Sequence, residues 1–260
     1  MYVKGREEME EKRKKVLITG ASSGIGRDIA RDFAKRGYDL ILVARNQSRL
    51  EDLNTVLKTN VRIITKDLSI RQNCIDLYNE VGDIDILVNN AGFGVFGEFD
   101  ETDLETELKL IDTNIVAVHI LTKLYLKDMI KKDSGQILNV ASIAGFMPGP
   151  LMAAYYSSKS YVLRLSQSIR EELNKKKSNV KISVLCPGPV RTNFNNVAGV
   201  KFSMSSLSSE YVASYAVKNM LKKKFLIIPG FQVKMAAVAS KIVPNKFVAK
   251  ITYIIQKRKK

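Results

Sequence analysis

The chain has 260 residues, 45% of them hydrophobic and 26% charged, and its net charge is +16. This composition is typical of a folded globular protein and excludes disordered, collagen-like and disulfide-framework chains. The positive charge is concentrated at one end, because residues 211–260 contain twelve Lys and Arg side chains and no Asp or Glu. A nucleic-acid-binding face would spread its lysines along a surface with interleaved aromatic residues, so we expect no nucleic-acid partner.

The first residues and the cysteines indicate the compartment. Residues 1–13 are charged and lack the apolar segment of a signal peptide, and no uninterrupted apolar run in the chain reaches the roughly 18 residues of a spanning helix. Cys74 and Cys186 are far apart and lack metal-ligand spacing. We therefore expect a cytoplasmic protein with reduced cysteines and no metal site.

Short β-branched apolar runs alternate along the chain with helical periodicity. The runs predict strands at 16–19, 40–43, 61–65, 84–88, 136–140, 181–185 and 225–228. The segments between them predict helices at 24–36, 47–58, 70–81, 105–131 and 154–175. This alternation predicts one doubly wound α/β domain with a seven-stranded parallel sheet over residues 14–230, between a charged extension (1–13) and a basic C-terminal extension (231–260).

A glycine-rich turn follows the first predicted strand. Residues 19–26 read TGASSGIG and lead directly into a predicted helix. Glycines permit a tight turn close to a pyrophosphate, whose charge is stabilised by the free N–H groups at the helix start. This position between strand and helix predicts a dinucleotide site.

The sequence contains two Tyr-x-x-x-Lys elements. Tyr155 and Lys159 follow the predicted strand at 136–140 and stand thirteen residues after Ser142, whereas Tyr253 and Lys257 lie in the basic tail and receive no chemical role. Residues four apart share a helix face, so the first pair can point into one cleft. A nearby ammonium favours the phenolate, and we expect Lys159 to lower the pKa of Tyr155 from its ordinary value of about 10.

The end of the second strand indicates which nicotinamide is bound. Asp39 begins that strand, at the end away from the cofactor, and Arg45 follows its carboxyl end. No carboxylate is there to repel a 2′-phosphate, and a guanidinium can bind one bidentately. We predict NADP(H); the open alternative is that Arg45 is a solvated loop residue and both cofactors are accepted.

These motifs together resemble the short-chain dehydrogenase/reductase family over about residues 14–228. The similarity rests on the glycine turn, Asp67, NNAG at 89–92, PGPVRT at 187–192, and a catalytic set of Asn114, Ser142, Tyr155 and Lys159. The resemblance implies a Rossmann-type fold and a homodimer or homotetramer. It implies that Tyr155 donates a proton to a carbonyl, Ser142 holds the carbonyl oxygen, Lys159 bonds the nicotinamide ribose and Asn114 positions a water.

The resemblance also implies the cofactor-binding residues. They are Gly20, Ser22, Ser23, Gly24, Ile25, Gly26, Arg45, Asp67, Leu68, Asn90, Ala91, Gly92, Tyr155, Lys159, Pro187, Gly188, Val190 and Thr192. The expected function is that of an NADPH-dependent carbonyl reductase, or reversible alcohol dehydrogenase. The alternative is a non-catalytic NADP-binding regulatory or scaffold protein of the same fold, against which the complete catalytic set argues.

Two further patterns concern the substrate and the tail. Apolar residues follow the predicted site motifs and indicate a small apolar ketone or acyl-type substrate; they are Phe93, Phe96, Phe146, Met147, Leu151, Met152, Phe194, Val197, Val200, Phe202 and Met204. In the tail, residues 246–260 place Phe247, Val248, Ile251, Ile254 and Ile255 on one helical stripe among lysines. This helix either packs on the protein or a neighbouring subunit, which we favour, or makes weak peripheral contact with an anionic membrane.

Overall fold

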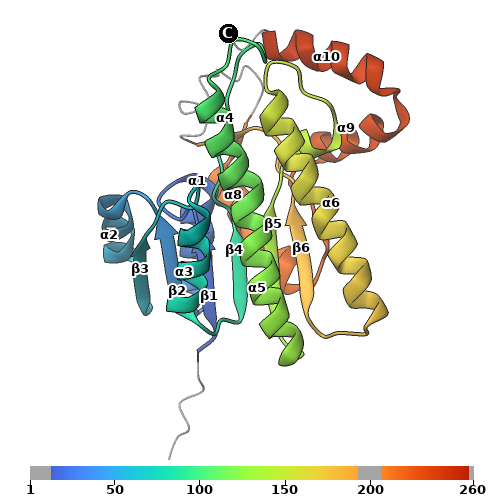
Figure 1. The fold of residues 1–260 in the computed structure, drawn as a ribbon. Helices are drawn as coiled ribbons and strands as arrows, with labels where there is room; N and C mark the ends of the chain where they lie inside the picture. Colours follow the sequence, from blue (N-terminus) through green and yellow to red (C-terminus); the bar gives the residue numbers. More distant parts are fainter. Residues whose placement is uncertain (1–12, 193–205, 258–260) are drawn as a thin grey trace, which may run out of the picture.

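A parallel sheet of seven strands forms the centre of the protein. The computed structural model describes residues 13–192 and 206–257. The strand order is β3-β2-β1-β4-β5-β6-β9, and every pairing is parallel (Figure 1). The strands are β1 Lys15–Thr19, β2 Asp39–Ala44, β3 Val61–Thr65, β4 Ile86–Asn89, β5 Gln136–Val140, β6 Lys181–Leu185 and β9 Leu226–Ile227. The predicted doubly wound, seven-stranded fold is confirmed.

Helices cover both faces of the sheet because its strands are apolar on both sides. In β1, Ile18 packs toward one hydrophobic cluster and Leu17 toward the other, as the alternation of side chains along a strand requires. One face is covered by α1 Gly24–Lys35, α2 Gln47–Val56 and α8 Ser209–Leu221, and the other by α3 Arg71–Val81, α5 Ala117–Lys131 and α6 Ala153–Lys175. The sequence analysis names no element for α8 or for the small sheet of β7 Val190–Arg191 and β8 Leu207–Ser208.

The helix predicted at 105–131 is divided in the structure. It begins as α4 Leu104–Ile111, where the Asp103 carboxylate accepts a hydrogen bond from the Thr106 N–H at 2.8 Å, and it continues as α5. Between them lies a π-helical segment, Asp112–Val116. A π turn contains one extra residue, which changes the direction of nearby side chains and is frequent at functional sites. Asn114 lies in this segment.

A chain of buried amides links the middle of the sheet to its helices. Asn89 Nδ2 in β4 donates to Asn139 Oδ1 in β5 at 2.9 Å and to Thr122 Oγ1 in α5 at 3.0 Å. Asn139 Nδ2 donates in turn to Ser166 Oγ in α6 at 3.0 Å. Buried polar groups with partners fix one relative placement of the elements that carry them, so this chain holds β4, β5 and α6 in register.

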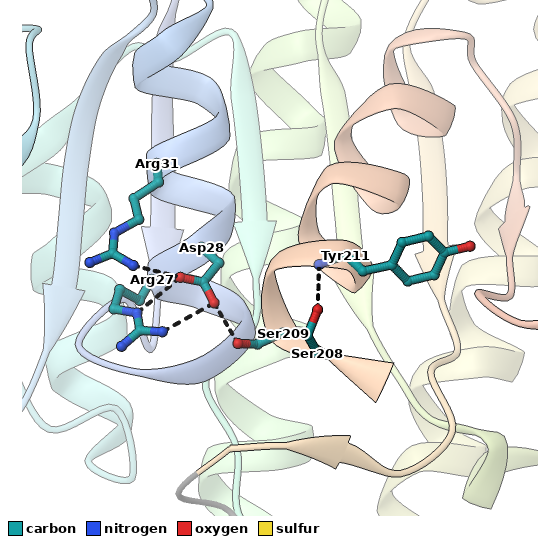
Figure 2. Close-up of polar contacts among 6 residues, drawn as sticks. All are labelled: Arg27, Asp28, Arg31, Ser208, Ser209 and Tyr211. Carbon is teal, nitrogen blue, oxygen red and sulfur yellow. Dashed lines mark hydrogen bonds and ion pairs between the residues drawn. The ribbon is translucent and has the colours of Figure 1, made fainter. Parts of the chain in front are cut away.

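A buried carboxylate joins α1 to α8 (Figure 2). Asp28 lies between Ser209 and the guanidinium groups of Arg27 and Arg31, with N···O distances of 3.0 and 3.2 Å to the arginines, and accepts a hydrogen bond from Ser209 Oγ. Ser208 caps α8 by accepting a hydrogen bond from the Tyr211 N–H at 3.2 Å. Because β8 pairs with β7, these contacts also position the segment that follows β6.

Two helices end the described chain, α9 Phe231–Ile242 and α10 Asn245–Lys257. The sequence predicts a helix over 246–260, and of its expected apolar stripe only Val248 packs on the protein. Val248, Thr252 and Gln256 are buried, whereas Phe247, Ile251, Ile254 and Ile255 are exposed. Among the described helices, none is long and apolar enough to cross a membrane. The division of the chain at residue 230 stays a prediction.

Candidate active site

A cleft of about 640 Å³ opens at the carboxyl ends of the strands. It lies where the strand order reverses, between β1 and β4, which is the usual ligand site in a doubly wound sheet. Every residue that the sequence analysis assigned to catalysis or cofactor binding lines this cleft, apart from Gly26 and Asn114. The fold therefore brings the six loops that follow β1 to β6, together with α6, into one site.

The glycine turn is shaped by contacts that leave no room for side chains. Gly20 has φ of +66°, and a Cβ on Gly26 would lie 2.4 Å from the Gly20 carbonyl oxygen and 2.3 Å from Asn90 Nδ2. Asn90 Nδ2 donates to the carbonyls of Thr19 and Gly20, each at 3.1 Å, and joins the turns after β1 and β4. Gly26 thus lets α1 approach this junction, which explains why it does not line the cleft.

The start of α1 suits an anionic ligand. Its N-cap, Ser23, makes no side-chain capping hydrogen bond, and Ser22, Ser23 and Gly24 line the cleft. The first N–H groups of a helix lack intrahelical acceptors and lie at the positive end of its dipole. The residues present therefore fit a dinucleotide pyrophosphate.

Three cationic side chains surround the far end of the cleft. Arg45 follows β2, and its Nη1 lies 4.0 Å from Asp67 Oδ2. Arg49 in the first turn of α2 and Lys66 after β3 also line the cleft. The sequence analysis gave Arg49 no role and missed Lys66, although the pairing of β2 with β3 places residue 66 beside the end of β2. These side chains fit a 2′-phosphate.

Asn114 holds the turn after β4 rather than lining the cleft. Its Nδ2 donates to the Phe93 carbonyl at 2.9 Å and to Ser158 Oγ at 3.1 Å, and its Oδ1 accepts from the Phe93 N–H at 3.0 Å. A Cβ on Gly92 would lie 2.8 Å from Asn114 Oδ1 and 3.3 Å from Lys159 Nζ. The amide of Asn114 therefore lies close to the lysine, and its water-positioning role stays a prediction.

Ser142, Tyr155 and Lys159 lie together at the inner end of the cleft. Lys159 Nζ is 5.8 Å from the centre of the Tyr155 ring and donates to the Val140 carbonyl at 3.0 Å. Ser142 Oγ accepts a hydrogen bond from the Ala144 N–H at 3.2 Å. Ser142 also hydrogen-bonds the Tyr155 side chain. The three side chains thus form a polar cluster in the cleft wall.

Burial sets the protonation of this cluster. It raises the pKa of Tyr155 to about 12, against the opposite effect of the hydrogen bond with Ser142. It lowers the pKa of Lys159 to about 8. Both shifts follow from the cost of holding a charge away from water. The net direction of the pKa shift of Tyr155 is opposite to the sequence-based expectation, because burial outweighs the hydrogen bond with Ser142 that favours the phenolate.

The substrate side of the cleft includes both expected and unexpected residues. Phe93 and Met152 line it as predicted, and Phe96 packs against Met152. Phe146 lies elsewhere, with Lys241 Nζ of α9 6.0 Å from its ring centre. Of the other predicted apolar residues, those between 193 and 205 lie outside the described residues; they are Phe194, Val197, Val200, Phe202 and Met204.

Tyr156 and Gln256 also line the cleft, and the sequence analysis assigned neither to it. Tyr156 is adjacent to Tyr155 on the same helix, so its position in the sequence could have indicated that it lies near the cleft. Gln256 belongs to α10, a hundred residues further along the chain, and nothing in the local sequence indicates that it reaches this site. Only the packing of α10 on the protein shows it.

The chain is similar to known oxidoreductases in sequence and in fold. Residues 14–200 match the family described as short chain dehydrogenase. An uncharacterized oxidoreductase of Staphylococcus epidermidis is 34% identical over 185 residues, covering 70% of this chain and 80% of the relative. A very-long-chain 3-oxoacyl-CoA reductase of Rattus norvegicus is 29% identical over 216 residues, covering 78% of this chain and 67% of the relative. The solved structure of a short-chain dehydrogenase from Sphingobium yanoikuyae in complex with NADPH has a TM-score of 0.80 at 30% identity, covering 88% of this chain and 93% of that one.

Proposed function

Since the chain belongs to the short-chain dehydrogenase family and is an NADP(H)-dependent oxidoreductase acting on carbonyl and alcohol groups, we propose a substrate class and a proton donor for it. The substrate is an apolar ketone or acyl-type carbonyl, which the enzyme reduces with Tyr155 as the proton donor. The observation that supports this most is the meeting of Ser142, Tyr155 and Lys159 with the glycine turn in one cleft. A protein that only binds the cofactor does not need a proton donor in that place.

The protonation states of the cluster suit reduction. With a pKa of about 12, Tyr155 holds its proton at neutral pH and can donate it to a carbonyl oxygen that Ser142 also hydrogen-bonds. Loss of that proton leaves a phenolate, which the nearby Lys159 ammonium stabilises. When bound, NADPH supplies the hydride that reaches the carbonyl carbon. The carbonyl then becomes an alcohol by gaining one hydride and one proton.

Cofactor choice rests on the cationic end of the cleft. We assign the 2′-phosphate of NADP(H) to Arg45, together with Arg49 and Lys66. The free N–H groups at the start of α1 would hold the pyrophosphate, and the Lys159 ammonium would bond the nicotinamide ribose. Asp67 beside Arg45 would contact the adenine, as the family resemblance implies.

The substrate class follows from the lining of the open side. Phe93 and Met152 are apolar, and Phe96 and Tyr156 pack against Met152. Similarity to a 3-oxoacyl-CoA reductase supports an acyl-type carbonyl as one candidate. Apolar lining with a few convergent polar groups is typical of sites for such molecules.

The test is NADPH oxidation across a panel of apolar ketones and acyl carbonyls. We expect Tyr155→Phe to lower turnover at least a hundredfold, because it removes the general acid while the ring keeps its packing. Tyr161→Phe on the same helix, whose hydroxyl bonds His119, is the matched control. NADPH binding, measured by fluorescence, shows that each variant is folded. Equal turnover in wild type and Tyr155→Phe would refute the proposed proton donor.

We also propose that the outer faces of α9 and α10 contact an anionic lipid surface. The exposed apolar residues of α9 recur at helical spacing, and α10 adds four more; they are Phe231, Met235, Val238, Ile242, Phe247, Ile251, Ile254 and Ile255. Lysines accompany them and no acidic residue follows Glu210. A second copy of the chain on this face would bring lysines against lysines, whereas anionic headgroups complement both its charge and its apolar residues.

Vesicle co-sedimentation tests this surface. Full-length protein should bind phosphatidylserine-containing vesicles more strongly than phosphatidylcholine vesicles, and Ile251→Glu with Ile254→Glu should abolish the difference. Val56→Glu, at an exposed apolar position on α2, is the control. Wild-type protein that binds neither kind of vesicle would contradict the lipid partner. A mass in solution that is half the wild-type mass in the α10 variant would also contradict it, and would indicate that this face forms a dimer. The homodimer or homotetramer implied by the family otherwise stays a prediction.

A further inference from the structure

The inner face of α10 forms part of the wall of the active-site cleft. Val248, Thr252 and Gln256 follow one another at four-residue spacing and are all buried. In Figure 1, α10 lies across the top of the molecule, near the end of α6 that carries Tyr155. Thr252 is satisfied within the helix, because its Oγ1 donates to the Val248 carbonyl at 2.8 Å. Gln256, one turn further, is the residue of α10 that lines the cleft.

The amide of Gln256 is only half satisfied. Its Nε2 donates to the Tyr156 hydroxyl at 2.6 Å. Its Oε1 is fully buried and has no hydrogen-bond partner among residues 13–192 and 206–257. A buried acceptor without a donor is costly, so native proteins rarely keep one that no ligand or water satisfies.

The surroundings hold this amide in place beside the proposed proton donor. The ring of Tyr156 packs so closely on Gly149 that a Cβ there would lie 2.1 Å from it, and it contacts the Tyr155 ring edge-on with 6.1 Å between centres. Tyr156 is therefore fixed between Gly149, Tyr155 and Gln256. Gln256 therefore belongs to a fixed part of the cleft lining, beside Met152 and the two tyrosine rings, where the lining is mostly apolar.

We propose that Gln256 Oε1 is a substrate-recognition site, which accepts a hydrogen bond from an O–H or N–H group that the substrate carries near its reacting carbonyl. This inference rests on the proposed function and narrows its substrate class from apolar carbonyl compounds to those with a donor beside the carbonyl. A site built around a buried acceptor discriminates strongly against analogues without the donor, because binding them leaves the acceptor unpaired. Tyr156 acts as a positioning residue, since it holds the amide through Nε2.

The test compares the three hydroxyacetophenones with their methoxy counterparts, which keep the oxygen and lose the donor. In wild type we expect at least one hydroxy isomer to be preferred in kcat/KM by about tenfold, the scale of one hydrogen bond. Gln256→Met, which keeps the length of the side chain, should remove the preference. Tyr156→Phe should weaken it. Gln167→Met on α6, outside the cleft, should leave it intact.

A binding measurement separates this inference from the reductase proposal. The same ketones are titrated into Tyr155→Phe protein loaded with NADPH, where proton transfer is blocked. A hydroxyl preference in binding that Gln256→Met removes supports the recognition site, even if the wild type turns over none of these ketones. No hydroxyl preference for any isomer, or equal losses for hydroxy and methoxy ketones in Gln256→Met, would overturn it and leave Gln256 a packing residue.

Discussion

The buried ammonium of Lys159 should lower the free energy of unfolding of the protein. The Lys159 side chain is buried, and burial lowers its pKa from 10.5 to about 8. A shift of this size corresponds to a penalty of about 3 kcal/mol on folding with the charge in place, at roughly 1.4 kcal/mol for each pH unit. We therefore expect Lys159→Met to be more stable than wild type at pH 7, although it loses activity.

The pH dependence distinguishes this cause from packing. The folded pKa is below the unfolded one, so the penalty is complete below pH 8, declines as pH rises, and is absent above 10.5. Between pH 7 and pH 9.5 the stability advantage of Lys159→Met should fall by about 2 kcal/mol. The hydrogen bond from Lys159 Nζ to the Val140 carbonyl also contributes to stability, and this contribution does not follow the titration of the ammonium. The quantity to compare is therefore the change of the stability difference with pH.

Urea unfolding followed by circular dichroism at the two pH values measures the difference directly. Lys131→Met, at an exposed lysine near the end of α5, is the control and should show little change. The same titration predicts that wild-type kcat/KM falls about tenfold for each pH unit above 8, as the ammonium is lost. A Lys159→Met advantage that is absent at pH 7, or equal at both pH values, would refute the reasoning.

Two other predictions concern the cofactor and the fold. Arg45→Ala should raise KM for NADPH about tenfold and leave KM for NADH unchanged, because it removes one charge-assisted hydrogen bond to the 2′-phosphate. Arg36→Ala, at the end of α1 where the guanidinium pairs with Asp32, is the control. Similar wild-type KM values for the two cofactors would contradict the assignment. Asp28→Asn should lower the free energy of unfolding by about 1–3 kcal/mol, because the carboxylate that joins α1 to α8 is buried. Asp32→Asn, on a more exposed ion pair of α1, should cost less than about 1 kcal/mol in the same urea assay.

Local patterns were sufficient for the sheet and for one wall of the cleft. Buried parallel strands such as β5 Gln136–Val140 are continuous apolar runs, so their position follows from composition alone. The glycine turn could be predicted because glycines stand at positions 20 and 26, directly between a predicted strand and a predicted helix. The pair Tyr155 and Lys159 could be assigned because helix geometry fixes their common face.

Other features depended on contacts that the local sequence does not specify. The apolar stripe of α10 left open whether it packs on the protein, on a neighbouring subunit or on a membrane; within this chain Ile251 and Ile254 are exposed, and the helix packs through Val248, Thr252 and Gln256. A helix buries whichever face its neighbours complement, and here the Tyr156 hydroxyl accepts a hydrogen bond from Gln256 Nε2. The pKa of Tyr155 was also misjudged, because the degree of burial depends on what surrounds the ring and a residue pattern reports only the neighbouring charge.

The sequence by itself determined the seven strands and most of the helices of the central domain, because each follows from a pattern within a few residues. It also predicted the glycine turn as a phosphate site and, through the family resemblance, Tyr155 and Lys159 as the proton-donating pair. Only the tertiary structure decided that Asn114 supports Phe93 from a π turn, that Lys66 lines the same cleft as Arg45, and that Gln256 of α10 reaches this cleft. Those arrangements depend on which surfaces pack together in the folded protein, and the packing free energy comes from residues that are far apart in the sequence.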